Sequence, residues 1–260
     1  MDVGGTVEEL PELEDEDELE PEEEEEDEGP SGPLPLPPLR VGIITGTGSY
    51  DWPGMRRVIR RDFQSTAGPV VVSNGEFWGV PVAHLSRHGD GHKRLSNHLD
   101  HRAHISALLE CGAEALISLT ACGSVDPDVP PGTLVIFDDL YFPSNRLPSG
   151  ELCTWYDLPG EKGRGHWIFD GPYSESIREI LIGAARDSAT PYIETGAYGH
   201  VDGPRFNTRA EIAALAACGV VAVSQTAGPE VVLAAEVELP MAVMGYVTDF
   251  ANGVVDEPTP

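Results

Sequence analysis

Short apolar segments that each end in small polar residues recur along this chain, and they constrain its fold more than any other feature. Four of them cover residues 39–44, 115–119, 220–223 and 241–247. Each has the composition of a buried strand. Because open α/β sheets bind ligands beyond the carboxyl ends of their strands, we expect the four polar ends to converge on one pocket.

Helical patterns separate these strands. Residues 101–111 and 173–189 carry apolar stripes at helical spacing, a helix is expected to follow Thr208 and to end at Gly219, and residues 231–239 predict a short helix. The order of elements predicts an α/β fold. We expect a single domain over residues 40–260, with a central mixed β-sheet flanked by helices.

Two further segments have less regular patterns. Residues 70–72 and 77–85 predict hairpin strands joined through the turn dipeptide Asn74-Gly75. Residues 143–166 are rich in Pro, Gly and charge, which indicates a long surface loop.

Charge is concentrated at the amino-terminal end. The chain has 260 residues and a net charge of −28, and residues 1–39 hold 17 acidic residues and no Lys or Arg. Such a segment is expected to be disordered, serving either as an acidic interaction arm or, more in keeping with its composition, as a solubilising extension. The acidity argues against a nucleic-acid partner, since phosphate backbones need clustered Lys and Arg.

Cellular location is predicted from what the sequence contains. Its apolar runs are shorter than the roughly 20 residues of a membrane span, and an acidic start is atypical of a secretory signal peptide. The four cysteines form no CxxC pair. We expect free thiols in a cytoplasmic protein without membrane association.

Two ligand classes receive only weak support. Six of the eight histidines lie between His84 and His104, but no neighbouring Cys or carboxylate completes a metal-binding pattern, so we expect no metal. The turn Gly46-Thr47-Gly48 follows a predicted strand, as in dinucleotide-binding folds. It lacks the third glycine and the acidic residue of that motif, which leaves a nicotinamide-dependent oxidoreductase as a remote alternative.

Six motifs occur in an order and spacing that are specific as a set. They are GIITGTG at 42–48, SRHG at 86–89, TACGS at 120–124, VDGPRF at 201–206, GPEVVLA at 228–234 and VTD at 247–249. With these motifs the chain resembles the trimeric purine nucleoside phosphorylases, most closely their 5′-methylthioadenosine phosphorylase branch. The resemblance implies phosphorolysis of a purine nucleoside, a homotrimer, and no cofactor beyond inorganic phosphate as co-substrate.

The resemblance also implies roles for individual residues. The expected phosphate-binding residues are Thr47, Arg87, His88, Thr120, Ala121 and Thr226. The expected base- and ribose-binding residues are Phe206, Asn207, Gln225 and Asp249. His166 matches a position that reaches into the neighbouring subunit's site near the substrate's 5′ group. On chemical grounds an arginine can hold phosphate through two hydrogen bonds, and the histidine beside it can add a further donor.

Asp249 is the expected catalytic residue. Cleavage of the glycosidic bond places positive charge on the ribose and negative charge on the departing base. A bound phosphate stabilises the first and acts as nucleophile, while a carboxyl group at the end of a strand can share a proton with the purine.

Departures from the family pattern bear on the substrate. Ala251 stands where 6-aminopurine-selective members carry a second Asp, Gln225 replaces a methionine under the ribose, and the amide of Asn207 tolerates either a 6-oxo or a 6-amino group. We expect S-methyl-5′-thioadenosine as the substrate, with inosine, guanosine or methylthioinosine as alternatives. The family's terminal helix is absent from this sequence, so a truncated relative that binds without catalysis is a further alternative.

Overall fold

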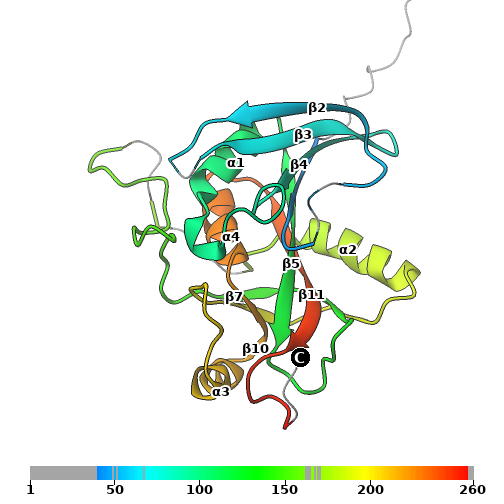
Figure 1. The fold of residues 1–260 in the computed structure, drawn as a ribbon, viewed down its shortest axis with the longest axis vertical. Helices are drawn as coiled ribbons and strands as arrows, with labels where there is room; N and C mark the ends of the chain where they lie inside the picture. Colours follow the sequence, from blue (N-terminus) through cyan, green and yellow to red (C-terminus); the bar gives the residue numbers. More distant parts are fainter. Residues whose placement is uncertain are drawn as a thin grey trace, which may run out of the picture. The chain divides into compact units, whose positions relative to one another are not determined.

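Strand β5 (Ala115–Ser124) lies at the centre of the sheet. The computed structural model describes residues 40–256 apart from positions 49, 51, 67, 162–164, 167, 169 and 170. Within this part, β5 pairs in parallel with β1 (Val41–Thr45) and β11 (Met241–Phe250), and antiparallel with β10 (Val220–Ser224). β5 and β11 run side by side through the middle of Figure 1.

The described strands form one mixed sheet. From one edge their order is β2 (Arg56–Phe63), β3 (Val70–Phe77), β4 (Val80–Ser86), β1, β5, β10, β9 (Ala197–His200) and β7 (Asp139–Tyr141). A branch leaves this path where β11 pairs with both β5 and β6 (Leu134–Ile136), and β6 pairs with β8 (Tyr192–Ile193). The mixed sheet predicted from the sequence is thereby confirmed.

Helices cover the sheet. α1 (His101–Glu110) packs against α4 (Ala227–Glu236) and against β3 and β4, whereas α2 (Glu175–Asp187) packs against β11 and β6 on the other side of β5 in Figure 1. α3 (Arg209–Ala217) packs against β10, and a short 3₁₀ helix (Ser96–His98) precedes α1. None of the helices in the described part of the chain has the length and apolar character needed to cross a membrane.

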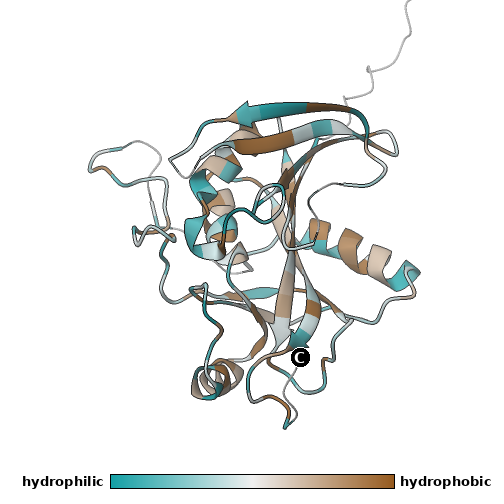
Figure 2. Cartoon of the chain, viewed as in Figure 1, coloured by the Kyte–Doolittle hydropathy of each residue, from teal (hydrophilic) through white to brown (hydrophobic). Residues whose placement is uncertain are grey.

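The main apolar core lies between α1, α4 and the sheet. Its fully buried members include Ile44, Leu85, Ile105, Leu108, Leu116, Leu233 and Val243. Outside it, edge strand β2 is hydrophilic over most of its length, whereas β3 carries a hydrophobic stretch (Figure 2). This arrangement leaves the strand ends of β1, β5, β10 and β11 to build the site.

Four local predictions were wrong. The strand predicted over 115–119 continues to Ser124, because residues 120–124 pair with β11. The hairpin turns at Trp78-Gly79, because both residues adopt the positive φ angles (50° and 83°) that a two-residue turn requires, and Asn74-Gly75 lies inside β3. The last helix begins at Ala227 rather than at 231, since Pro229 fits the first helical turn. The segment 143–166 is not all surface, because Leu147 and Cys153 are buried.

The segments 1–39 and 257–260 lie outside the described residues, so the predicted disorder of the acidic segment stays a prediction. All four cysteines are free thiols, and three of them are buried.

A buried tyrosine holds the start of α4. The hydroxyl of Tyr198, which is 0% exposed, accepts hydrogen bonds from the backbone N–H groups of Thr226 (3.4 Å) and Ala227 (3.1 Å). These are amides that the helix itself leaves without partners. Tyr198 therefore fixes Thr226 at the edge of the site.

Replacing this hydroxyl tests its role. We expect Tyr198→Phe to lower the free energy of unfolding by about 1–3 kcal/mol, because two buried N–H groups lose their acceptor. Urea denaturation measures the change. Tyr246→Phe is the control, since Tyr246 is 51% exposed and should change stability little. A Tyr198→Phe variant as stable as the parent protein would show that the hydroxyl contributes nothing.

Candidate active site

The polar ends of four strands surround one cavity of about 800 Å³. Ten of the eleven predicted site residues line it, namely Thr47, Arg87, His88, Thr120, Ala121, Phe206, Asn207, Gln225, Thr226 and Asp249. The exposed His166 is not among the lining residues. The expected convergence of strand ends is thus present, while the role of each residue stays a prediction.

Arg87 is held by the protein on nearly every side. It follows β4, is 1% exposed, and donates from Nε to Glu230 Oε1 (2.8 Å) and from Nη2 to Glu230 Oε2 (3.1 Å). Nη2 also donates to Ser118 Oγ (2.8 Å), and Nη1 donates to the carbonyl oxygen of Leu119 (2.8 Å). Four of the five guanidinium N–H groups are therefore occupied.

The remaining N–H group of Arg87 is on Nη1, beside the turn after β1. A side chain at Gly46 would place its Cβ only 2.6 Å from Nη1, so glycine is required there. No partner for this N–H occurs among the described residues. In this geometry a single N–H group of Arg87 is left for a ligand, so it could donate one hydrogen bond to phosphate rather than the expected two. The role of Arg87 in binding phosphate stays a prediction.

His88 differs from its expected role as a second donor. Its Nδ1 lies 2.8 Å from the carbonyl oxygen of Arg94, and burial lowers its pKa from 6.5 to about 4. At neutral pH the ring is therefore neutral, with the proton on Nδ1 donated to that carbonyl. Nε2 is then an acceptor of hydrogen bonds.

Three threonines line the cavity. Thr47 is exposed in the turn after β1, and Thr226 is buried immediately before α4. Thr120 lies on β5, where its Oγ1 is 2.9 Å from the hydroxyl of Ser224 on β10. Glu230 offsets the charge of Arg87, so the hydrogen-bond donors that these threonines add to the cavity lining are neutral hydroxyl groups.

An aromatic residue, Phe206, and a carboxyl group, that of Asp249, also line the cavity. Asp249 is half-buried near the end of β11, just after a register shift in its pairing with β5, and its Oδ1 accepts from the hydroxyl of Thr248 (2.7 Å). Asn252 donates from Nδ2 to the backbone oxygen of Asn207 (2.7 Å), which ties the chain after β11 to the loop before α3. Both segments line the cavity.

Gln225 connects two segments beside the cavity through its side-chain amide. Its Oε1 accepts from the hydroxyl of Ser96 (2.7 Å), and its Nε2 donates to the backbone oxygen of Arg205 (3.0 Å). Both amide atoms of Gln225 are thus engaged within the protein, and its expected role as a base- and ribose-binding residue stays a prediction.

Sequence reasoning missed several members of this site. Glu230, Ser118 and Ser96 carry hydrogen bonds that hold predicted residues in place. Glu230 did carry a signal, because it is a charged residue in the otherwise apolar run 227–235. Ser118 and Ser96 have no comparable signal, since single serines are common in strands and loops.

The amino-acid sequence matches the phosphorylase superfamily over residues 40–260. The chain belongs to the phosphorylase superfamily. It is a nucleoside phosphorylase-type enzyme, as the six sequence motifs predicted.

Two relatives and one solved structure show which phosphorylases this one resembles. It is 39% identical to a probable 6-oxopurine nucleoside phosphorylase of Thermococcus kodakarensis, over 83% of this chain and 80% of that protein. It is 33% identical to an S-methyl-5′-thioadenosine phosphorylase of Bradyrhizobium diazoefficiens, over 81% and 70%. A crystal structure of a mutant adenosine/methylthioadenosine phosphorylase of Schistosoma mansoni, in complex with methylthioadenosine, matches with a TM-score of 0.73 and 30% identity, covering 82% of this chain and 81% of that one.

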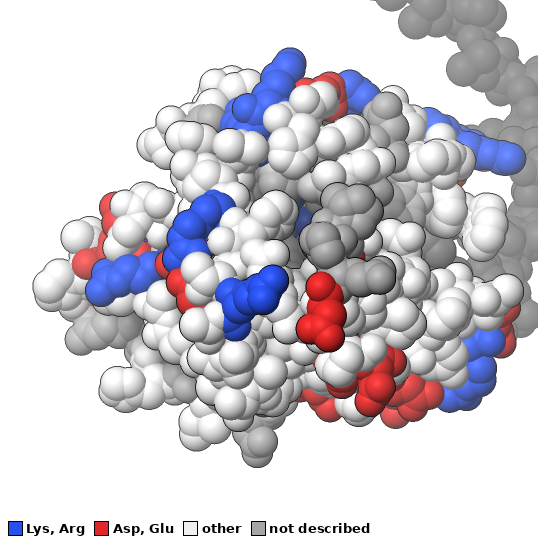
Figure 3. Space-filling model, turned by 60° about the horizontal axis from the view of Figure 1, so that its bottom comes forward, with Lys and Arg blue, Asp and Glu red and all other residues white. Residues whose placement is uncertain are grey.

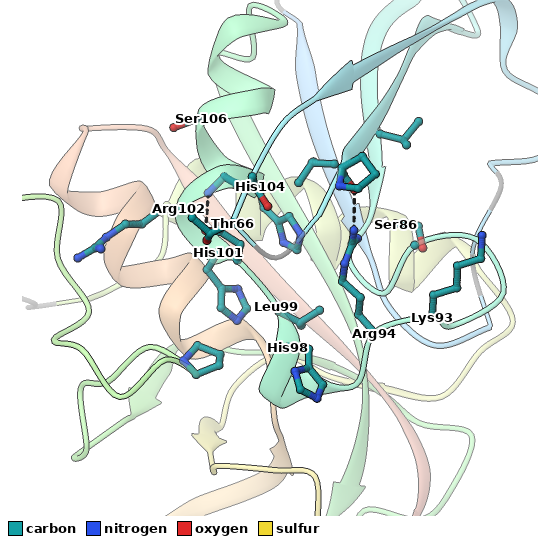
Figure 4. Close-up of a pocket in the computed structure, with 18 of the residues that line it drawn as sticks. Thr66, Ser86, Lys93, Arg94, His98, Leu99, His101, Arg102, His104 and Ser106 are labelled. Atoms are coloured by element: carbon teal, nitrogen blue, oxygen red, sulfur yellow. Dashed lines mark hydrogen bonds between the residues drawn. The ribbon is translucent and has the colours of Figure 1, made fainter.

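This phosphorylase has a second cavity, of about 1060 Å³, beside α1 (Figure 4). It is lined by four of the six histidines between His84 and His104, namely His84, His98, His101 and His104. Its arginines are engaged within the protein, since Arg94 donates to the carbonyl oxygen of Pro69 and Arg102 to that of Thr154. Among the described residues, no three His, Cys, Asp or Glu side chains are placed to hold a metal ion.

Acid should destabilise this phosphorylase through its buried histidines. Burial lowers the pKa of His104 and of His200 to about 3, and that of His101 well below 6.5. The unfolded chain therefore binds more protons than the folded one from about pH 6.5 downward. The contribution of these neutral histidines to the free energy of unfolding is fully present above about pH 6.5. It is lost as the pH falls, by up to roughly 1.4 kcal/mol per pH unit for each histidine.

Urea unfolding at pH 7.5, 6.5 and 5.5 measures this dependence. His104→Leu should show a shallower decline, because the variant has one buried group fewer to protonate. A stability that is unchanged between pH 7.5 and 5.5 would contradict the assignment of neutral buried histidines.

Proposed function

We propose that the protein catalyses the phosphorolysis of 6-oxopurine nucleosides, releasing the free base and a ribose 1-phosphate. The observation that carries the proposal is a single cavity lined by the hydroxyl-bearing residues Thr47, Thr120 and Thr226, by Arg87, by the aromatic ring of Phe206 and by the carboxyl group of Asp249. Such a cavity suits a molecule with an anionic co-substrate beneath a sugar and a planar base beyond it.

In the proposed reaction a phosphate oxygen attacks C1′ of the ribose while the bond from C1′ to the purine nitrogen breaks. The bonding electrons pass into the purine ring, and N7 takes up the proton that the carboxylic acid form of Asp249 donates, so that the base leaves neutral. The site stabilises positive charge on the ribose through the phosphate, and Asp249 holds the proton at the base.

At the phosphate end, Thr47 and Thr226 donate hydroxyl hydrogen bonds, and Arg87 adds its free N–H group. Thr120 donates once its proton turns away from the carbonyl oxygen of Ala121, to which it points at 3.2 Å. The neutral Nε2 of His88 accepts the one proton of the hydrogen phosphate dianion. This assignment gives each phosphate oxygen a partner, although the ion pair of Arg87 with Glu230 has no net charge.

Substrate choice is assigned to the 6-oxopurines on two grounds. The relative named for these substrates is more similar, at 39% identity, than the relative named for methylthioadenosine, at 33%. In addition, Ala251 leaves out the second carboxylate that would select a 6-amino group, and Asn207 lines the cavity with an amide able to bond a 6-oxopurine edge. The expected preference for methylthioadenosine from the sequence is therefore replaced by its 6-oxopurine alternative.

Methylthioadenosine phosphorolysis is a second candidate. The carboxyl group of Asp249 accepts hydrogen bonds when ionised, which suits the N–H groups of a 6-aminopurine. The structural match to a methylthioadenosine complex supports the same candidate.

We also propose a cytoplasmic homotrimer. Phe206 is 80% exposed and Leu95 is 47% exposed, although both line the cavity, so a neighbouring copy would remove apolar surface from water by covering them. His166 of that copy would then reach the 5′ end of the substrate.

A panel of nucleosides tests the proposal. Inosine, guanosine, methylthioinosine, adenosine and methylthioadenosine are incubated with the protein, with and without phosphate, and base release is followed by chromatography. We expect phosphate-dependent release of hypoxanthine and guanine at the highest kcat/KM. Release of adenine alone would favour the second candidate, and no phosphate-dependent release from any nucleoside would contradict both.

Two variants of Asp249 test its role. Asp249→Ala should lower kcat by roughly 100-fold or more, because a positioned acid contributes about 10²–10⁴-fold, while the urea midpoint changes little. Asp249→Asn should raise the kcat/KM ratio of inosine to methylthioadenosine, since an amide donates to a 6-oxo group. Asp139→Asn is the control, because Asp139 is exposed at the start of β7 and does not line the cavity. Equal losses of activity and stability in Asp249→Ala would rule out the catalytic assignment.

A further inference from the structure

A buried carboxylate lies directly behind the arginine of the site. Glu230 is in the first turn of α4 and is 0% exposed. Both of its oxygens contact the guanidinium of Arg87, at 2.8 and 3.1 Å. Glu230 is not among the residues that line the cavity, whereas Arg87 is.

Ser118 completes this arrangement from β5. Its Oγ accepts from Arg87 Nη2 (2.8 Å) and donates to Glu230 Oε2 (2.7 Å). Arg87 is therefore held by groups from α4 and β5. All of its N–H groups except one on Nη1 donate to protein acceptors.

If Arg87 served only to attract an anion by its positive charge, a carboxylate paired with it would weaken that attraction. The carboxylate offsets the charge of Arg87 and fixes the plane of the guanidinium, so its contribution is geometric rather than a gain in positive potential. Orientation to within a fraction of an ångström matters strongly for a group that must meet a reacting anion.

We infer that Glu230 is a positioning residue for the anion subsite: it aims the free N–H of Arg87, beside Gly46, at the phosphate. This inference rests on the proposed function for the identity of the anion. If charge alone governed anion binding, Glu230→Gln would lower the Kd for phosphate, because a negative charge is removed. If Glu230 orients Arg87, the same substitution raises that Kd.

The test is calorimetric titration with inorganic phosphate in the absence of nucleoside. We expect Glu230→Gln to raise the Kd for phosphate by about tenfold or more. Glu236→Gln is a matched control, because Glu236 is also a buried glutamate of α4 but bonds Thr154 and Trp155 away from the cavity. It should leave the phosphate Kd unchanged. An unchanged or lower Kd in Glu230→Gln overturns the inference.

Kinetics separate positioning from a general structural defect. In Glu230→Gln the KM for phosphate should rise while the KM for the nucleoside stays the same, and equal rises in both would overturn the inference. Should Glu230→Gln fail to fold, Ser118→Ala provides the same readout, because it removes one contact and keeps the ion pair. We expect about a threefold rise in the phosphate Kd for Ser118→Ala, and no rise would count against the inference.

Chemical rescue gives a further readout. Guanidinium ion should restore phosphate binding to Arg87→Ala but not to the Arg87→Ala, Glu230→Gln double variant, because Glu230 holds the added cation. Equal rescue of both variants would overturn the inference. If the unmodified protein binds phosphate but releases no base, the proposed function fails, while the phosphate affinities of the variants still decide the role of Glu230.

Discussion

The buried ion pair between Arg87 and Glu230 connects the elements on which the site depends. Arg87 follows β4, Glu230 is on α4, and Ser118 and Leu119 on β5 supply two further hydrogen-bond partners. Desolvating two charges is costly unless each is fully hydrogen-bonded, and removing one partner of such a pair typically destabilises a protein by about 3–5 kcal/mol. The pair therefore fixes α4 against the sheet and places the end of β4 beside the turn after β1.

Once these elements are fixed, the arrangement of the cavity follows. Tyr198 holds the start of α4 through two amides, which sets Thr226, while the link between Thr120 and Ser224 joins β5 to β10. Basic side chains are scattered rather than gathered into a continuous patch on the face shown in Figure 3. Within the cavity the charge of Arg87 is offset by Glu230, so the proposed phosphate contacts rely on oriented hydroxyl and N–H groups more than on accumulated charge.

The sequence predicted the layout better than the details. Polar residues after Ile44 and Val223 marked the ends of β1 and β10 correctly, because a strand buried on both faces leaves a clear apolar run. The polar residues after Leu119 did not mark the end of β5, which continues to Ser124 through pairing with β11. The Trp78-Gly79 turn was missed, since Asn74-Gly75 carries the stronger local signal and tertiary pairing overrides it. The same limit applies to Arg87, whose type suggests a ligand contact but whose partners 31 and 143 positions away are set only by the fold.

A crystal structure with inorganic phosphate and hypoxanthine tests the central claim most directly. The account predicts phosphate within hydrogen-bonding distance of Arg87 Nη1 and of the hydroxyls of Thr47, Thr120 and Thr226, with the base between Phe206 and Asp249. Phosphate bound instead in the second cavity, beside Lys93 and Arg94, with the strand-end cavity holding no anion, would contradict it.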